Sequence, residues 1–245
     1  MENQMHEDGC FITLTYDDNN LPSMRTLVKK DLTDFFKRLR KSLGDVKVRY
    51  FAVGEYGERF KRPHYHIILF GTSFKEDRKL YKQRSNPLYT SELLTRAWGK
   101  GFANFGAVSF ESAAYCARYC LKKVNASKEE LDVACDIETG EVFSRIPEFC
   151  VMSRRPGIGS TWYDKYCDDV RRTDFVVARG RRMKSPRFFD KLFERYFKDD
   201  FLQTKAKRVV DIEHRHVTVD EYLGLVEAEQ AEVHLQSALS KRKIE

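Results

Sequence analysis

The sequence predicts an α+β fold, with antiparallel strands in a sheet and two helices packed behind it. Three observations favour this class. Short runs rich in β-branched and aromatic residues are bounded by turn residues, which is typical of strands. Two longer segments carry apolar residues at helical spacing. The segments follow one another as strand, helix, strand, strand, strand, helix, which is the order of a layered α+β protein.

The first strand is predicted over residues 9–15, where the run Gly-Cys-Phe-Ile-Thr-Leu-Thr precedes a polar cluster and a proline. The first helix is predicted over residues 32–43, because apolar residues recur there every three or four positions. Lysines and arginines occupy its other face, and Gly44 is placed to end the helix.

Two further strands are predicted over residues 47–53 and 64–70, which are rich in valine, isoleucine, tyrosine and phenylalanine. The charged segment 54–62 between them is typical of a turn. Residues 74–86 are also charged and have no clear periodicity, so we expect an exposed, irregular insertion there.

A short helix is predicted over residues 91–98, with Ser91 as its N-cap. Residues 101–110 alternate aromatic and small side chains, which favours a strand. Residues 111–124 have the composition and apolar spacing of a second long helix, and this helix completes the core.

The signals are weaker after residue 125. Residues 136–152 resemble a hairpin, and residues 160–170 are a predicted helix after a basic glycine-containing loop. We expect a catalytic-type domain over residues 1–185, elaborated after residue 125, and a charged helical extension over residues 186–245.

The composition excludes several classes of protein. The chain has 245 residues, and its 44 lysines and arginines against 37 acidic residues give a net charge of +7. No apolar run approaches the roughly 20 residues of a membrane helix, and the first residues lack the features of a signal peptide. The six cysteines are scattered, with no zinc-site spacing. We therefore expect a soluble intracellular protein with a mild attraction to polyanions.

The motif His64-Tyr65-His66 lies in the third predicted strand. Alternate residues of a strand share a face, so the two imidazoles project side by side and Tyr65 points to the core. Glu55 lies where the preceding strand turns back, and it can reach the same face. Two histidines and a carboxylate with open positions suit Mg²⁺ or Mn²⁺ held together with a substrate phosphate.

The same H-x-H spacing also occurs by chance on half-exposed strands, and the chain holds a second example in His214-Arg215-His216. No strong strand follows that second pair, so we assign it to the surface. A metallohydrolase class that continues H-x-H with Asp-His is excluded, because Ile67 and Ile68 follow His66.

Tyr115, Tyr119 and Lys122 lie at helical spacing in the second long helix. Tyrosines at positions i and i+4 are neighbours on one face, and a lysine one further turn along is close to them. Two phenols beside an ammonium group can act as nucleophiles that form covalent intermediates. The alternative is a helix with aromatic packing residues and a basic C-terminal turn that suits its dipole.

In chain order, three segments resemble the three motifs of the HUH-superfamily rolling-circle replication initiators, or Rep endonucleases. These are residues 11–15 (Phe-Ile-Thr-Leu-Thr), His64-Tyr65-His66, and the Y-x-x-K segment from Tyr119 to Lys122. Tyr115 is similar to the added tyrosine of the paired-tyrosine version. The surrounding residues 50–58, 62–66 and 152–159 resemble the initiators of gokushoviruses within the Microviridae, and the resemblance covers about residues 9–190.

The resemblance implies a five-stranded antiparallel sheet flanked by helices, like an RNA-recognition-motif core, with the histidine pair on a central strand. It also implies an HUH endonuclease, a metal-dependent nickase and strand-transferase of single-stranded DNA. This enzyme would initiate and terminate rolling-circle replication of a bacteriophage through a 5′-phosphotyrosine. It assigns the residues as follows: metal ligands His64, His66 and Glu55; nucleophiles Tyr115 and Tyr119; motif lysine Lys122.

Such an enzyme would work in the cytoplasm of a bacterial host on origin DNA, without a membrane. It would use a host helicase and DNA polymerase, because the chain has no phosphate-binding loop of the Walker type. Predicted DNA contacts are a stacking tyrosine and basic clusters: Tyr16, Arg154, Arg155, Arg179, Arg181 and Arg182. The alternatives are an HUH transposase, a plasmid initiator, or a non-catalytic nucleic-acid-binding module.

Overall fold

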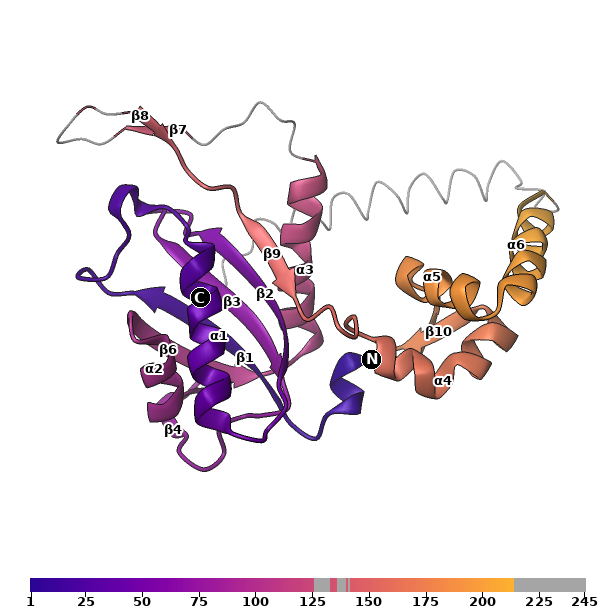
Figure 1. Ribbon diagram of the computed structural model, residues 1–245, viewed down its shortest axis with the longest axis horizontal. Helices are drawn as coiled ribbons and strands as arrows, with labels where there is room; N and C mark the ends of the chain where they lie inside the picture. The colour runs from indigo at the N-terminus through magenta and orange to yellow at the C-terminus, as the bar shows by residue number, and fades with distance from the viewer. Residues whose placement is uncertain (126–132, 136–139, 141, 214–245) are drawn as a thin grey trace. The chain divides into compact units, whose positions relative to one another are not determined.

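A computed structural model describes residues 1–125, 133–135, 140 and 142–213 of the chain (Figure 1). Contacts between Cα atoms divide the chain into two compact units, Met1–Lys165 and Tyr166–Glu245. The boundary at residue 185 that the sequence predicts separates an endonuclease domain from a helical extension, and it stays a prediction.

The first unit is built on a seven-stranded antiparallel sheet, so the predicted α+β class is confirmed. The resemblance implied five strands, and the sheet is larger than that. In spatial order the strands are β4 (Lys79–Lys82), β5 (Leu88–Thr90), β6 (Gly101–Ala107), β1 (Gly9–Tyr16), β3 (Pro63–Phe70), β2 (Arg49–Tyr56) and β9 (Phe149–Met152).

The two additional strands come from the segment that the sequence predicts to be irregular. Every residue of β4 is exposed, so its side chains show no alternation between apolar and polar positions that would mark a strand. β5 joins the sheet at its edge, where Tyr89 lies opposite Phe105 of β6. This hairpin therefore widens the sheet beyond β6 and leaves the five inner strands, with β3 at their centre, as implied by the resemblance.

Helices cover both faces of the sheet, which corrects the prediction that both long helices lie behind it. α1 (Lys29–Leu43) and α2 (Glu92–Trp98) pack on one face, and α3 (Phe110–Asn125) packs against β2, β3 and β9 from the other (Figure 1). Gly44 ends α1 at a φ of 59°, and the Ser91 hydroxyl caps α2 by accepting the Leu94 amide at 3.1 Å.

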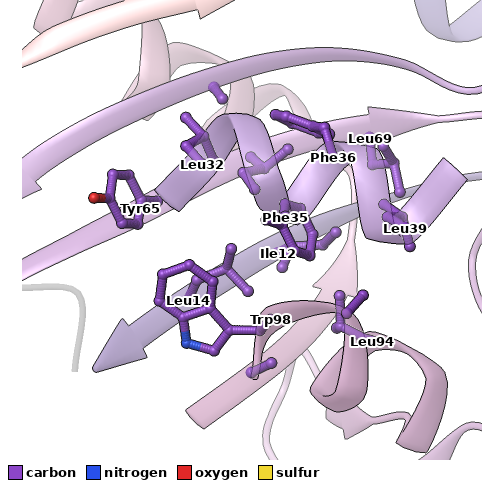
Figure 2. Close-up of a cluster of buried hydrophobic side chains, with 14 of the residues drawn as sticks. Ile12, Leu14, Leu32, Phe35, Phe36, Leu39, Tyr65, Leu69, Leu94 and Trp98 are labelled. Carbon is purple, nitrogen blue, oxygen red and sulfur yellow. The ribbon is translucent and has the colours of Figure 1, made fainter. Parts of the chain in front are cut away.

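The main core lies between the sheet and the pair α1 and α2 (Figure 2). Alternate residues of the central strands project into it, and one face of each helix meets them. The labelled members are Ile12, Leu14, Tyr65 and Leu69 from the strands, Leu32, Phe35, Phe36 and Leu39 from α1, and Leu94 and Trp98 from α2. A smaller cluster of Val53, Ile68, Phe70 and Cys116 lies under α3.

The predicted hairpin after residue 125 forms, as β7 (Val133–Cys135) pairs with β8 (Val142–Ser144), although most of its turn lies outside the described residues. The chain returns to the sheet as β9. It then enters α4 (Ser160–Thr173), which is longer than the predicted helix and contains the boundary between the two units.

The second unit is described to residue 213. After α4 it contains β10 (Phe175–Ala178), β11 (Arg181–Lys184), α5 (Arg187–Tyr196) and α6 (Lys198–Glu213). Its apolar contacts centre on Phe193, which packs on Phe201. Arg208 on α6 donates to the carboxylates of both Asp174 and Asp190, which joins the two ends of the unit. His214-Arg215-His216 lies outside the described residues. None of the described helices has the length and apolar character to cross a membrane.

Candidate metal and tyrosine site

Glu55, His64 and His66 lie together on the α3 face of the sheet. Glu55 on β2 is directly opposite His64 on β3, and His66 follows two residues later on the same face. One ligand atom from each of the three residues lies within 4.8 Å of the other two. The intervening Tyr65 is fully buried in the main core on the opposite face, as its alternation predicts.

One oxygen of Glu55 is shared by both imidazoles. Its Oε1 lies 2.6 Å from His64 Nε2 and 3.1 Å from His66 Nε2. The carboxylate is only 3% exposed, and its Oε2 is buried with no hydrogen-bond partner among the described residues. A buried carboxylate oxygen without a partner is costly, so the cluster has one acceptor that a bound cation would satisfy.

The far nitrogens of both imidazoles also have partners. His64 Nδ1 donates to the Arg62 carbonyl at 3.1 Å, and His66 Nδ1 lies 3.1 Å from the Thr13 hydroxyl. Metal-binding histidines commonly bond through the second nitrogen in this way, because the bond orients the ring and fixes its tautomer. Both Nε2 atoms are therefore directed at the cluster, and the donor set fits a divalent cation such as Mg²⁺ or Mn²⁺.

The three groups shift one another's protonation. Burial by itself raises the pKa of Glu55, but hydrogen bonds from the two imidazoles outweigh it and hold the pKa well below its ordinary value. Burial lowers the pKa of His64, yet the bond to Glu55 prevails and the net pKa is raised. For His66 burial prevails, and the pKa is lowered. The carboxylate is thus ionised and His66 is held as the neutral base that a metal requires.

Tyr115 on α3 reaches the same carboxylate. Its hydroxyl donates to Glu55 Oε1 at 2.6 Å, and its ring stands edge-on to His66 with centroids 5.1 Å apart. The guanidinium of Arg118, one turn further along α3, lies 5.1 Å from the centroid of the Tyr115 ring. The phenol therefore lies beside both the candidate ligands and a cation.

Local sequence explains why α3 presents Tyr115 here. Ser109 and Ser112 bond reciprocally, each hydroxyl accepting the other's amide, which fixes the start of the helix. Cys116, directly after Tyr115, is fully buried in the cluster under α3. With its start capped and this side packed on the sheet, the helix holds the preceding residue over the histidines.

Tyr119 and Lys122 are in the last part of α3, and their side chains lie outside the described residues. Their roles as second nucleophile and motif lysine stay predictions. The backbone of Tyr119 is one helical turn beyond Tyr115, which is the spacing that the sequence predicts.

The predicted basic DNA contacts belong to both units. Arg154 and Arg155 are exposed in the loop after β9, whose carbonyls at Pro156 and Gly157 accept from Arg49 at 2.8 Å. The second set is exposed on the β10–β11 hairpin of the second unit: Arg179, Arg181 and Arg182. The hairpin and the loop are thus accessible to solvent, each in its own unit.

The prediction that Tyr16 stacks on DNA bases is corrected by its burial. Its side chain is 0% exposed, and its ring packs on Trp98 in the main core. Its hydroxyl donates to Asp31 at 2.9 Å and is bonded to the Tyr65 hydroxyl at 2.8 Å. The ring therefore has a structural role, and no face of it is open to a base.

Sequence reasoning missed three neighbours of the site. Thr13 orients His66, Phe11 stacks on the His66 ring with centroids 5.3 Å apart, and Arg118 lies over Tyr115. Phe11 and Thr13 alternate on β1 with the same period as the two histidines on β3. Pairing the two predicted strands in register would have placed both residues beside His66.

Comparison with known proteins gives a consistent set of relatives. A family model for the replication-associated protein ORF2 matches residues 9–124. The chain is 28% identical to replication-associated protein VP4 of Bdellovibrio phage phiMH2K, over 92% of this chain and 72% of that protein. It is 31% identical to replication-associated protein ORF2 of Spiroplasma virus 4, over 78% of this chain and 59% of that protein.

A third relative, replication-associated protein ORF4 of Chlamydia phage 1, is 28% identical over 82% of this chain and 49% of that protein. The chain therefore spans between about half and three quarters of the lengths of these relatives. No solved structure matches the chain. Through residues 9–124, which carry the histidine strand and the tyrosine helix, the chain belongs to the ORF2 family of replication-associated proteins.

Proposed function

We propose that this chain initiates and terminates rolling-circle replication of a small single-stranded DNA phage, as a site-specific, metal-dependent nickase and strand-transferase. The observation that carries the proposal is the hydrogen bond from the Tyr115 hydroxyl to Glu55 Oε1 at 2.6 Å, within the cluster of His64 and His66. A phenol joined to a cation-binding carboxylate is arranged for attack on a phosphodiester. The family of replication-associated proteins supports the biological setting.

In this proposal Glu55, His64 and His66 hold one Mg²⁺ or Mn²⁺. When bound, the ion polarises a non-bridging oxygen of the scissile phosphate and neutralises part of its charge. The unpartnered Oε2 of Glu55 and the two inward Nε2 atoms are the support for this assignment. Thr13 and the Arg62 carbonyl orient the two rings from behind.

The chemical step belongs to the tyrosine. The Tyr115 oxygen attacks phosphorus, an oxygen–phosphorus bond to tyrosine forms, and the bond from phosphorus to the 3′-oxygen breaks. The phenolic proton leaves along the hydrogen bond to Glu55, and the departing 3′-oxygen takes a proton from water. The products are a 5′-phosphotyrosine and a free 3′-hydroxyl, which a host DNA polymerase can extend behind a host helicase in the bacterial cytoplasm.

Termination reverses this step at a second tyrosine. Tyr119 lies one helical turn beyond Tyr115, so it can cleave the regenerated junction while the first ester is still in place. The released 3′-hydroxyl then attacks the first phosphotyrosine, which closes a circle and frees Tyr115. Lys122 is proposed to favour the phenolate and to screen the phosphodiester.

Basic side chains are proposed to hold the DNA backbone. Arg154 and Arg155 extend from the loop after β9, and the β10–β11 hairpin carries Arg179, Arg181 and Arg182. Replacing Arg181 by alanine should weaken binding to all DNA sequences similarly and reduce the salt dependence of binding by about one counterion. A salt dependence equal to that of the original protein would exclude this contact.

A covalent adduct tests the function directly. The full chain is incubated with Mn²⁺ and a pool of single-stranded oligonucleotides of random sequence, and adducts are recovered under denaturing conditions and sequenced. We expect a protein–DNA adduct with a defined cleavage sequence, absent in EDTA. Tyr115→Phe and Tyr119→Phe, singly and together, identify the attacking phenol, and Tyr81→Phe, an exposed tyrosine on β4, is the matched control.

Each alternative gives a different result. A non-catalytic binding module binds DNA and forms no adduct. An adduct that persists in the Tyr115 and Tyr119 double variant excludes the tyrosine assignment, and cleavage in EDTA excludes the metal. A transposase or plasmid initiator forms the same adduct, and the recovered cleavage sequence separates it from a phage initiator when it is compared with phage and transposon ends.

A further inference from the structure

Phe102 is a large apolar side chain in an unusual position. It lies on β6 and is 68% exposed, although its neighbours Ala103 and Phe105 are buried in the main core. Because alternate residues of a strand point to opposite faces, Phe102 projects from the face opposite the core. This is the face that carries the histidines, so packing in the described core does not account for the side chain.

The strand register places Phe102 in line with the candidate site. Phe102 lies opposite Thr15 on β1, Thr15 lies opposite His64 on β3, and His64 lies opposite Glu55 on β2. Residues directly opposite one another in a sheet project to the same side. Neighbouring strands are about 4.8 Å apart, so Phe102 is roughly 10 Å along this row from His64.

α3 leaves this part of the row open. The helix packs mainly against β2, β3 and β9 and places Tyr115 over the histidines. Phe102 lies on β6, on the other side of β1 from β3. The row therefore passes from a covered end, where the carboxylate and phenol meet, to an open end that presents an aromatic ring.

The backbone holds Phe102 rigidly. The preceding Gly101 has a φ of +135°, and a Cβ there would lie 2.2 Å from the Asp17 amide nitrogen and 2.6 Å from the Thr15 carbonyl oxygen. Only glycine permits this close approach of β6 to β1. The ring thus stands on a paired strand and not on a loose loop, which suits a fixed contact with a ligand.

We propose that Phe102 is a stacking platform for an unpaired DNA base next to the phosphodiester held at Glu55, His64 and His66. Exposed aromatic rings beside a backbone-binding site are how proteins hold single-stranded DNA, and such stacking tolerates any base. The inference rests on the proposed function, because it takes the DNA strand to run along this row. It adds a base-binding residue, which positions the strand without taking part in the chemistry.

Binding of a thymidine oligonucleotide of about 12 nucleotides, within the usual footprint of such sites, tests the proposal. The full chain is titrated in EDTA, so that cleavage does not intervene, and fluorescence anisotropy gives the affinity. We expect Phe102→Ala to lower the affinity by about 5- to 150-fold and Phe102→Trp to retain it. Tyr81→Ala, which removes a 63% exposed aromatic ring from β4, is the control and should change the affinity less than twofold.

A photocrosslink locates the contact. An oligonucleotide carrying 5-iododeoxyuridine couples on irradiation to aromatic side chains stacked on that base, and mass spectrometry of the peptides should identify Phe102. The proposal is wrong if Phe102→Ala binds as tightly as the original chain, or if it and Tyr81→Ala weaken binding equally. It is also wrong if Phe102→Ala instead abolishes a dimer seen by sedimentation, because the ring would then contact a second copy.

The two proposals can fail separately. If the random pool yields no tyrosine adduct but Phe102→Ala weakens binding, the nickase proposal falls and the stacking contact stands. If the adduct forms and Phe102→Ala changes neither affinity nor crosslinking, the stacking contact falls and the nickase stands.

Discussion

The two faces of the same sheet are built from the same strands and have opposite characters. On the α1 and α2 face, Tyr16 and Tyr65 are fully buried, and their hydroxyls bond to each other and to partners in the core. On the α3 face, Glu55 keeps one buried oxygen unpartnered among the described residues, and Tyr115 donates to the other. One face satisfies its polar groups, and the other holds them in reserve.

The difference shows how period-two alternation separates stability from chemistry. His64, Tyr65 and His66 are consecutive, yet Tyr65 supports the core while the histidines build the site. The core can be closely packed without constraining the site, because no side chain has to serve both faces. Substitutions at adjacent positions should therefore affect different properties.

The largest effect is expected for Leu14→Ala. Leu14 is 0% exposed and lies in the core shown in Figure 2. Removing its buried methyl groups should lower the free energy of unfolding by about 2–5 kcal/mol. Urea unfolding of the full chain, followed by circular dichroism, measures the change. A loss below about 1 kcal/mol would mean that this face is not the one that stabilises the unit.

The adjacent residue should behave differently. Thr13→Val keeps the shape of the side chain but removes the hydroxyl that meets His66 Nδ1. We expect a 10- to 100-fold loss of Mn²⁺ affinity, because outer partners of metal-binding histidines have effects of about this size. Calorimetric titration with Mn²⁺ measures it, and unfolding should change by less than about 1 kcal/mol.

Thr15→Val is the matched control for Thr13→Val. Thr15 lies on the same face opposite His64, and among the described residues its side chain bonds to neither imidazole. Equal losses of Mn²⁺ affinity in the two variants would contradict the specific role of Thr13.

The histidine strand was predictable because its signals are local. Alternation places His64 and His66 on one face, and the short turn before them places Glu55 on the paired strand. Ser91 and Gly44 mark helix ends through their own side-chain and backbone chemistry. Each of these inferences needed only neighbouring residues.

The features that failed depend on residues far apart in the chain. The face on which α3 packs depends on Cys116 meeting Val53 and Ile68, which no local pattern specifies. Tyr16 was predicted to meet DNA because a polar loop follows it. Cys10, Ile12, Leu14 and Tyr16 alternate, so extending the strand by one residue would have placed its ring in the core.

Tyr16→Phe should have an intermediate effect on stability. The change removes one oxygen from the bonds to Asp31 and Tyr65 and leaves those buried groups short of a partner. We expect a loss of about 1–2 kcal/mol in the free energy of unfolding at neutral pH, with adduct formation retained. Unfolding by urea and the adduct assay are the two measurements.

High pH should reveal the same hydroxyl. Burial, together with Tyr65 and Asp31, raises the pKa of Tyr16, whereas an unfolded tyrosine ionises near about 10. Above about pH 10 the unfolded chain loses a proton that folded Tyr16 retains, so stability falls as pH rises. Tyr16→Phe should reduce that slope by about 1.4 kcal/mol per pH unit. An unchanged slope would contradict the burial of this hydroxyl.

The smallest change in stability is expected for Tyr115→Phe, which also removes a single phenolic oxygen. Glu55 Oε1 still has both imidazoles as partners, and the aromatic ring that contacts His66 remains. The free energy of unfolding should change by less than about 1 kcal/mol, since Glu55 Oε1 is not left without a bond. Adduct formation should nevertheless be lost at this tyrosine. If Tyr115→Phe instead destabilised the chain more than Tyr16→Phe, the hydroxyl on the α3 face would be a structural group, and the contrast between the two faces would not hold.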